Sequence, residues 1–215
     1  MNSAGVPITM ERINLTAPFN NAHIYTERLP LKSERTAYTG MVYHFRHGSM
    51  ETTYLDLPGH IAETDDGQHA ANCDLLDFYR RKSMLLRIAA PDGEYGITPE
   101  DLEKARAGRP WQEWVVINAL GGKPDGYAPA RKIYLTLESV DYLVSNGVKV
   151  LFSDAWESAR LDGVFLKFFA AGVSCVCNMV NMEKLPADRE FFLTLSFVPY
   201  PGAVTQIPAT LIAEI

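Results

Sequence analysis

Cysteine, positive charge and long apolar runs are all scarce in this 215-residue chain, and each shortage narrows its class. Three cysteines, an odd number, argue against a disulfide framework and favour a reducing, cytoplasmic environment. Lys and Arg (20) are outnumbered by Asp and Glu (26), and the net charge of −6 predicts no nucleic-acid partner. No apolar run approaches the roughly 20 residues that span a bilayer, so neither a membrane partner nor a signal peptide is expected.

The length and composition of the chain predict one globular domain over residues 1–215. A hydrophobic content of 47% allows a chain of this length to bury a substantial core. No internal repeat or low-complexity segment divides the sequence. We therefore expect a single fold and a binding site for a small molecule.

Strand and helix patterns alternate irregularly along this domain. Strands are expected at residues 38–46, 83–89, 114–120, 148–152, 173–179 and 191–199, and helices at 98–107, 136–146 and 161–171. The helix after Thr98 has the usual start, with Thr as N-cap, Pro99 at its first position and acidic residues in its first turn. Mixed strands with packed helices predict an α/β sandwich or open barrel.

The segment from Tyr54 to His60 holds the most informative side chains. Asp56 and His60 bracket Pro58, which restricts its own φ and biases the residue before it towards an extended backbone. A carboxylate and an imidazole held in this way suit acid–base chemistry. Tyr54 lies two residues before Asp56, so both face one side of an extended segment. Turn capping by Asp56 and sheet packing by Tyr54 remain open as purely structural roles.

This segment resembles the H-x-G-T-H-x-D-x-P-x-H motif of the cyclase family, which includes bacterial kynurenine formamidase-like hydrolases and polyketide-cyclase relatives. Thr53, Asp56 and His60 match the motif, whereas Met50 and Tyr54 replace its first two histidines. In the family, those two histidines and the aspartate bind zinc or manganese. The last histidine lies beside the reacting group.

The resemblance extends from about residue 13 to the C-terminus. Residues 173–182 resemble the strand that carries a glutamate ligand in the family, and Cys177 stands in its place. A further family histidine, on the preceding helix, falls near Phe165. The resemblance implies an α/β fold with a mixed β-sheet forming a barrel-like β/β/α core with packed helices.

The replaced residues predict a pocket without a metal. A zinc site needs three or four convergent N, S or O ligands, and manganese likewise needs several oxygen or imidazole donors. Thioether, neutral phenol and phenylalanine do not replace three imidazoles. Asp56, His60 and Cys177 remain an alternative three-ligand zinc or manganese site.

We interpret the pocket first as that of a metal-independent cyclase or dehydratase acting on a small polyketide-like or aromatic carbonyl compound. His60 would transfer a proton, Asp56 would orient it or act as a second base, and Tyr54 would donate a hydrogen bond to the substrate carbonyl. Cys177 becomes a candidate nucleophile only if its pKa is lowered, for example by His60. The substrate would also contact residues at three replaced or matching positions, which are Met50, Thr53 and Phe165.

Two other interpretations remain open. One is a formamidase-like or lactonase-like hydrolase with an atypical metal site. The other is a non-catalytic relative that binds a small ligand. The resemblance also implies a homodimer or homotetramer, and the apolar segment from Ile13 to Phe19 is a candidate interface.

Overall fold

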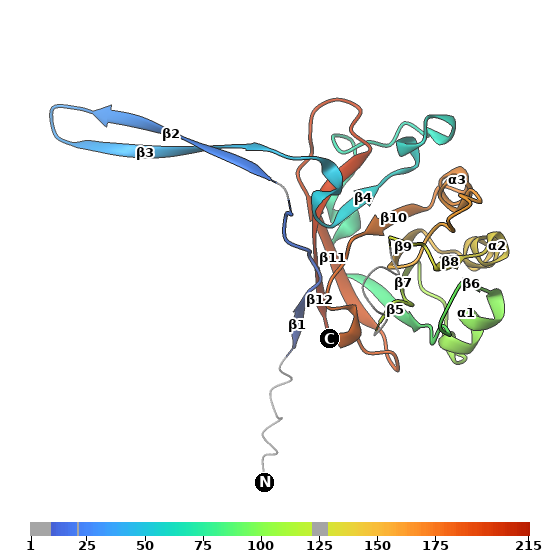
Figure 1. Cartoon of the computed structure of the whole chain (residues 1–215). Coiled ribbons are helices and arrows are strands. Elements are labelled where there is room, and N and C mark those ends of the chain that lie inside the picture. Colours follow the sequence, from blue (N-terminus) through green and yellow to red (C-terminus); the bar gives the residue numbers. More distant parts are fainter. Residues whose placement is uncertain (1–9, 21, 122–128) are drawn as a thin grey trace, which may run out of the picture.

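The computed structural model describes residues 10–20, 22–121 and 129–215, and its body is a mixed β-sheet that closes on itself (Figure 1). In these residues, seven strands follow the order β12–β11–β5–β7–β9–β10–β4, and β4 pairs back with β12. Strand β1 pairs with β12 outside this ring. The single-domain α/β fold with a barrel-like sheet, predicted from the sequence, is confirmed.

The strands of the body are β1 (Arg12–Asn14), β4 (Tyr54–Asp56), β5 (Arg81–Arg87), β7 (Trp114–Asn118), β9 (Val150–Ser153), β10 (Ser174–Cys177), β11 (Phe191–Phe197) and β12 (Gln206–Glu214). Two small sheets are formed by β2 (His23–Lys32) with β3 (Ala37–Arg46) and by β6 (Tyr95–Ile97) with β8 (Ile133–Leu135). The α-helices are α1 (Pro99–Arg106), α2 (Leu137–Ser145) and α3 (Val164–Ala170). The short 3-10 turns are η1 (Ser49–Glu51), η2 (Pro58–His60), η3 (Ala62–Thr64), η4 (Leu75–Phe78) and η5 (Met182–Lys184).

Four neighbouring strands, β5, β7, β9 and β10, run parallel to one another. The α-helices cover the outer face of this part of the sheet (Figure 1). Both faces of β7 are therefore buried: Val116 belongs to the core inside the sheet, whereas Val115 and Ile117 belong to the core under the helices. This double burial explains why its sequence is a continuous apolar run.

Helix α3 begins three residues later than the sequence predicts. Leu161 and Gly163 have φ values of 58° and 94°, which a right-handed helix does not allow. The helix therefore starts at Val164. By contrast, α1 begins as predicted, because Thr98 and Asp101 form a reciprocal capping box.

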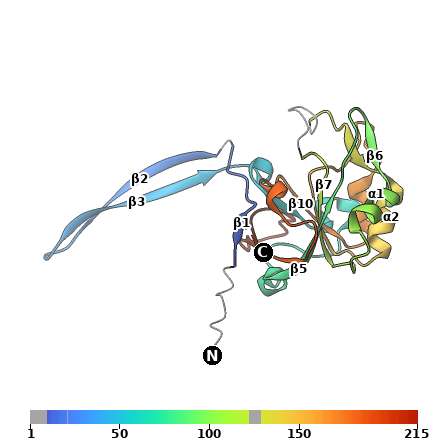
Figure 2. The same ribbon diagram turned by 90° about the horizontal axis from the view of Figure 1, so that it is seen from below.

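Strands β2 and β3 form a two-stranded arm that projects from the body (Figure 1; Figure 2). The strand at 38–46 is confirmed in β3, but the sequence did not predict β2. Its pattern includes Pro30 and three charged residues, which obscure the strand periodicity. No side chain of either strand is buried.

The segment from Ile13 to Phe19, a candidate interface from its sequence, instead starts inside the body. Ile13 and Leu15 are buried in the core enclosed by the sheet, so they are not available to a partner. Phe19 at its end is exposed. Among the residues described, no helix is both long and apolar enough to cross a membrane.

Candidate functional site

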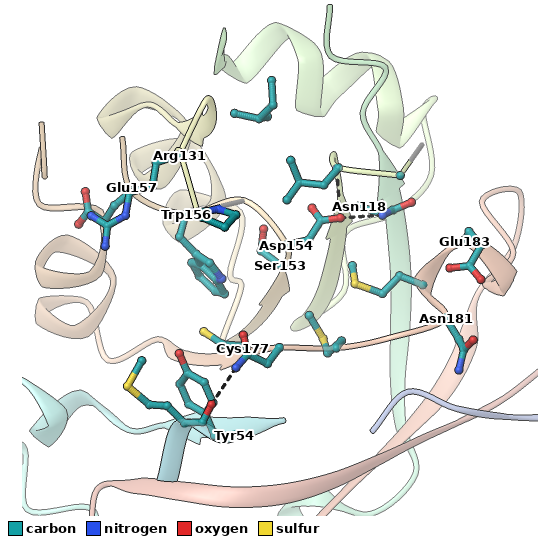
Figure 3. Close-up of a pocket in the computed structure, with 18 of the residues that line it drawn as sticks. Tyr54, Asn118, Arg131, Ser153, Asp154, Trp156, Glu157, Cys177, Asn181 and Glu183 are labelled. Carbon is teal, nitrogen blue, oxygen red and sulfur yellow. Dashed lines mark hydrogen bonds between the residues drawn. The ribbon is translucent and has the colours of Figure 1, made fainter. Parts of the chain in front are cut away.

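A cavity of about 680 Å³ opens at the carboxyl edge of the parallel strands. Its lining includes Asn118, Ser153 and Cys177, which are the last residues of β7, β9 and β10 (Figure 3). In open α/β sheets, ligands bind at this edge of the sheet, because loops leaving neighbouring strands place varied side chains there. The position of the cavity within the fold therefore identifies it as the candidate site.

Tyr54 and Cys177 face each other in the wall of this cavity. They are direct cross-strand partners on β4 and β10, and both are buried. Burial raises the pKa of the Tyr54 phenol, and the Cys177 thiol raises it further. Burial also raises the pKa of Cys177 well above its usual value, and the negative charge of Asp56 raises this pKa further. Both groups are therefore neutral at physiological pH. The lowered pKa that a Cys177 nucleophile requires is absent.

Asp56 lies two residues beyond Tyr54 on the same side of β4, and it is buried and does not line the cavity. Burial raises its pKa from 3.8 to about 6, against lowering contributions from a Gln206 hydrogen bond and the charge of His60. Its Oδ1 atom is buried without a hydrogen-bond partner. Asp56 is thus a carboxylate with a pKa close to neutrality and one free oxygen.

His60 lies outside the cavity lining and is exposed to solvent. Its Nε2 atom is 3.2 Å from Nε2 of Gln206, and its ring contacts Phe169 of α3 edge-on. The Ser49 hydroxyl donates to Oε1 of Gln206, so the amide directs its N–H groups towards His60 and Asp56. His60 Nε2 then accepts the hydrogen bond, which places the ring proton of neutral His60 on Nδ1.

Gln206 is a site residue that the sequence analysis missed. It lies directly opposite Asp56 in the β12–β4 ladder. Its partners come from a distant part of the chain, and an isolated glutamine carries no pattern that reveals such a pairing. Only the closure of the sheet brings Gln206, Asp56 and His60 together.

The remaining replaced family positions form apolar walls of the cavity. Met50 and Phe165 both line it, and the Phe165 ring stacks on Trp156 with 4.9 Å between centroids. Thr53 does not line the cavity. Its buried hydroxyl donates to the Asn178 carbonyl at 2.7 Å and accepts from the Ala17 N–H at 2.8 Å, so it is engaged in hydrogen bonds within the chain.

Asp154, which follows the last residue of β9, lines the cavity and also caps the turn after β7. Its carboxylate accepts from the backbone N–H groups of Ala119 and Leu120, at 2.8 and 3.1 Å, and from the Asn118 amide at 2.7 Å. Burial raises the pKa of Asp154, and these donors oppose the shift. The sequence analysis overlooked Asn118. Its position as the polar last residue of an otherwise apolar strand could have revealed it.

Three of the six non-glycine residues with positive φ in the described part of the chain line the cavity. Arg131, Asn178 and Asn181 have φ values of 49°, 58° and 60°, and all three line it. Left-handed φ is uncommon for residues other than glycine and is tolerated for asparagine. Such conformations often occur at functional sites, where neighbouring contacts hold them.

The side chains at this site do not fit the zinc or manganese centre that the family resemblance implies. Met50 offers only a thioether, Tyr54 a phenol and Phe165 no donor atom in place of three imidazoles, and Cys177 replaces a carboxylate. His60 bonds to Gln206 and does not line the cavity. Across the residues that the structure describes, no group of three His, Cys, Asp or Glu side chains is placed to hold a metal ion.

Comparison with known proteins identifies the family of this chain. The sequence matches the family described as "Putative cyclase" over residues 13–160, well over half of the chain. The chain belongs to this cyclase family. No curated protein matches the sequence. Membership was expected from the signature at Asp56 and His60, and the expectation is confirmed.

Several solved structures superpose on nearly the whole of this cyclase-family chain. Isatin hydrolase A from Labrenzia aggregata, bound to benzyl benzoate, superposes with a TM-score of 0.72 at 13% identity, covering 96% of this chain and 94% of that one. An isatin hydrolase bound to the product analogue thioisatinate gives 0.70 at 15% identity, covering 96% and 92%. A predicted metal-dependent hydrolase from Bacillus stearothermophilus gives 0.64 at 16%, covering 96% and 98%. These likenesses establish a shared fold.

Proposed function

We propose that this cyclase-family protein is a metal-independent enzyme that performs acid–base chemistry on a planar carbonyl compound. The observation that carries the proposal is the cavity at the carboxyl edge of β7, β9 and β10, with Tyr54 in its wall and the buried Asp56 two residues further along the same face of β4. Cyclisation or dehydration of a carbonyl compound needs a proton acceptor and a hydrogen-bond donor for the developing oxyanion. This pair of side chains provides both.

Tyr54 is the proposed donor. Its raised pKa keeps the phenol protonated, as a donor to a substrate oxygen must be. The low exposure of the ring restricts competition from water, which strengthens a hydrogen bond to developing negative charge. Removal of one such donor typically lowers kcat about 100-fold or more.

Asp56 is the proposed base. A pKa of about 6 leaves it ionised near neutral pH yet able to hold a proton during turnover. Its free Oδ1 is the acceptor, while Gln206 occupies its other hydrogen-bonding side and acts as a positioning residue. His60, exposed beside this pair, exchanges the proton with solvent. Cys177 contributes to the wall and takes no part as a nucleophile.

The substrate class follows from the cavity walls. The stacked Trp156 and Phe165 rings favour a flat, aromatic or conjugated molecule. Two isatin hydrolase structures of the same fold hold benzyl benzoate and thioisatinate, both of which contain aromatic rings. Hydrolysis of an amide or lactone is the second candidate reaction, and it is harder without a metal to lower the pKa of water.

The experiment screens isatin, benzyl benzoate and linear 1,3-diketones for binding and turnover. Binding is followed by tryptophan fluorescence, with Trp156→Phe expected to remove the response and Trp111→Phe to retain it. Trp111 is the matched control because it packs on Tyr142 and does not line the cavity. Turnover is followed by mass spectrometry of products.

Tyr54→Phe and Asp56→Asn should each reduce turnover about 100-fold while binding persists. Turnover unchanged by both substitutions would contradict the assigned roles. Binding without turnover of any compound would favour the non-catalytic alternative.

A further inference from the structure

We propose that this chain has a second binding site, for a free amino acid, at the opposite edge of the parallel strands. A cleft of about 430 Å³ lies there, within the usual size range of small-molecule sites. Its lining includes Arg81, Trp114, Val150 and Ser174, which are the first residues of β5, β7, β9 and β10. Among the described residues, none lines both this cleft and the cavity at the carboxyl edge, so the two sites are separate.

The floor of the cleft is apolar apart from one hydroxyl group. Trp114 and Val150 belong to the core inside the sheet, and Ser174 is aligned with them in the strand register. Phe78 packs on Trp114, with 6.1 Å between ring centroids. Ser174 is only 6% exposed, yet its hydroxyl makes no hydrogen bond within the described part of the chain. A buried hydroxyl normally has a hydrogen-bond partner, so this one is available to a polar group of a ligand.

The same end of the cleft carries a free positive charge. Lys149 also lines the cleft, and its carbonyl oxygen accepts the Ser174 N–H at 3.0 Å, so the two residues are adjacent. The Lys149 ammonium has no ion pair or hydrogen bond to a described residue, whereas Arg81 pairs with Glu113 at 3.0 Å. An ammonium and a hydroxyl side by side can both donate to a carboxylate. This end of the cleft therefore suits the carboxylate of a ligand.

The loop before β5 supplies a free negative charge to the cleft. Asp74 and Asp77 both line it. The Asp74 carboxylate accepts the Leu76 N–H at 2.9 Å and so caps η4, whereas the Asp77 carboxylate has no partner among the described residues. Burial raises the pKa of the lining thiol Cys73, and the charge of Asp77 contributes to this rise, so Asp77 lies near the thiol. Asp77 therefore suits an ammonium group.

A free cation, a free anion and an apolar floor together match an amino acid with an apolar side chain. A ligand with only a carboxylate would leave Asp77 unpaired, and one with only an ammonium group would leave Lys149 unpaired. Electrostatic complementarity of this kind selects a ligand that carries both charges. L-Phenylalanine is the probe, because its ring can pack against Phe78 and Trp114.

The test uses Cys73 as a reporter of occupancy. This half-buried thiol lines the cleft, whereas the other two cysteines are buried elsewhere. Its labelling by N-ethylmaleimide is followed by mass spectrometry, with and without L-phenylalanine, which should slow the reaction. 2-Phenylethylamine lacks the carboxylate and 3-phenylpropionate lacks the ammonium group. Each should bind at least about tenfold more weakly than L-phenylalanine, because it loses one set of charge-assisted hydrogen bonds.

Substitutions in the cleft test the assigned contacts. Ser174→Ala and Lys149→Met should each weaken binding of L-phenylalanine about tenfold. Lys104→Met is the matched control, because Lys104 is an exposed lysine of α1 that does not line the cleft, and it should bind like the wild type. Cys175 should stay unlabelled in every variant, which verifies folding because this thiol is buried.

Three results would each overturn the proposal. They are unchanged Cys73 labelling at L-phenylalanine concentrations up to about 10 mM, equal protection by all three compounds, and protection that survives Lys149→Met undiminished. Tyr54→Phe should bind L-phenylalanine like the wild type, because Tyr54 lines the other cavity. The outcome is thus independent of whether the proposed reaction occurs.

Discussion

Tyr54 and Cys177 are direct partners across the β4–β10 ladder, and both line the same cavity. In the family motif these two positions correspond to a histidine and a glutamate that bind a metal. The two positions meet in this chain, but Tyr54 and Cys177 supply neither the imidazole nor the carboxylate donor that the motif implies. This relationship underlies the expectations below.

The thiols should be inert in the native state. Burial raises the pKa of Cys175 and Cys177, so neither forms a reactive thiolate near pH 7. Ellman's reagent should label at most the half-buried Cys73 in folded protein, and all three cysteines after denaturation. Cys177→Ala should retain turnover. Rapid native labelling of Cys177 would instead restore it as a nucleophile.

Asp56 should make stability fall as pH rises. Its folded pKa of about 6 exceeds its ordinary value of 3.8, so between these values the folded state binds more protons than the unfolded state. Below pH 3.8 the carboxyl is protonated in both the folded and the unfolded state, and the folded state is then most stable with respect to this group. As the pH rises through the folded pKa of about 6, ionisation of Asp56 lowers the free energy of unfolding by up to about 3 kcal/mol.

Asp56→Asn should remove this dependence, because the amide keeps an oxygen for Gln206 but cannot ionise. Urea denaturation at pH 4 and pH 8 measures the effect, with the variant gaining on the wild type at pH 8. Parallel pH profiles for the two proteins would show that Asp56 does not titrate as described.

Thr53 should prove structural. Its hydroxyl bridges the Ala17 N–H and the Asn178 carbonyl in a fully buried position. Thr53→Val has nearly the same shape but leaves both groups without a partner, which should cost about 1–3 kcal/mol of unfolding free energy. Thr53→Ser keeps the hydroxyl and is the control. Equal stability of the Val and Ser variants would remove the bridging role.

Sequence patterns predicted the framework of this molecule but not its long-range pairings. Apolar runs predicted strands β7 and β9, which are buried on both faces. The capping box in residues 98–101 predicted the start of α1. The co-location of Tyr54 and Cys177 follows from the family motif. Gln206 and the arm could not be predicted in the same way, because a glutamine has no local signature and exposed strands lack a buried face to impose alternation.

Restoring the family's side chains should create a metal site. Asp56 is retained, and the combined changes Met50→His, Tyr54→His, Phe165→His and Cys177→Glu supply imidazole and carboxylate donors at the replaced positions. Calorimetric titration with zinc should detect tight binding to this variant and none to the wild type. Equal zinc affinity of both proteins would mean that the replaced positions do not govern metal binding.

The central claim is that the natural side chains work without a metal, and elemental analysis of untagged protein purified without chelators tests it most directly. We predict zinc and manganese far below one ion per chain, in preparations that still bind an aromatic carbonyl compound. Stoichiometric zinc or manganese would contradict the account. It would then point to Asp56, His60 and Cys177 as the ligands to substitute.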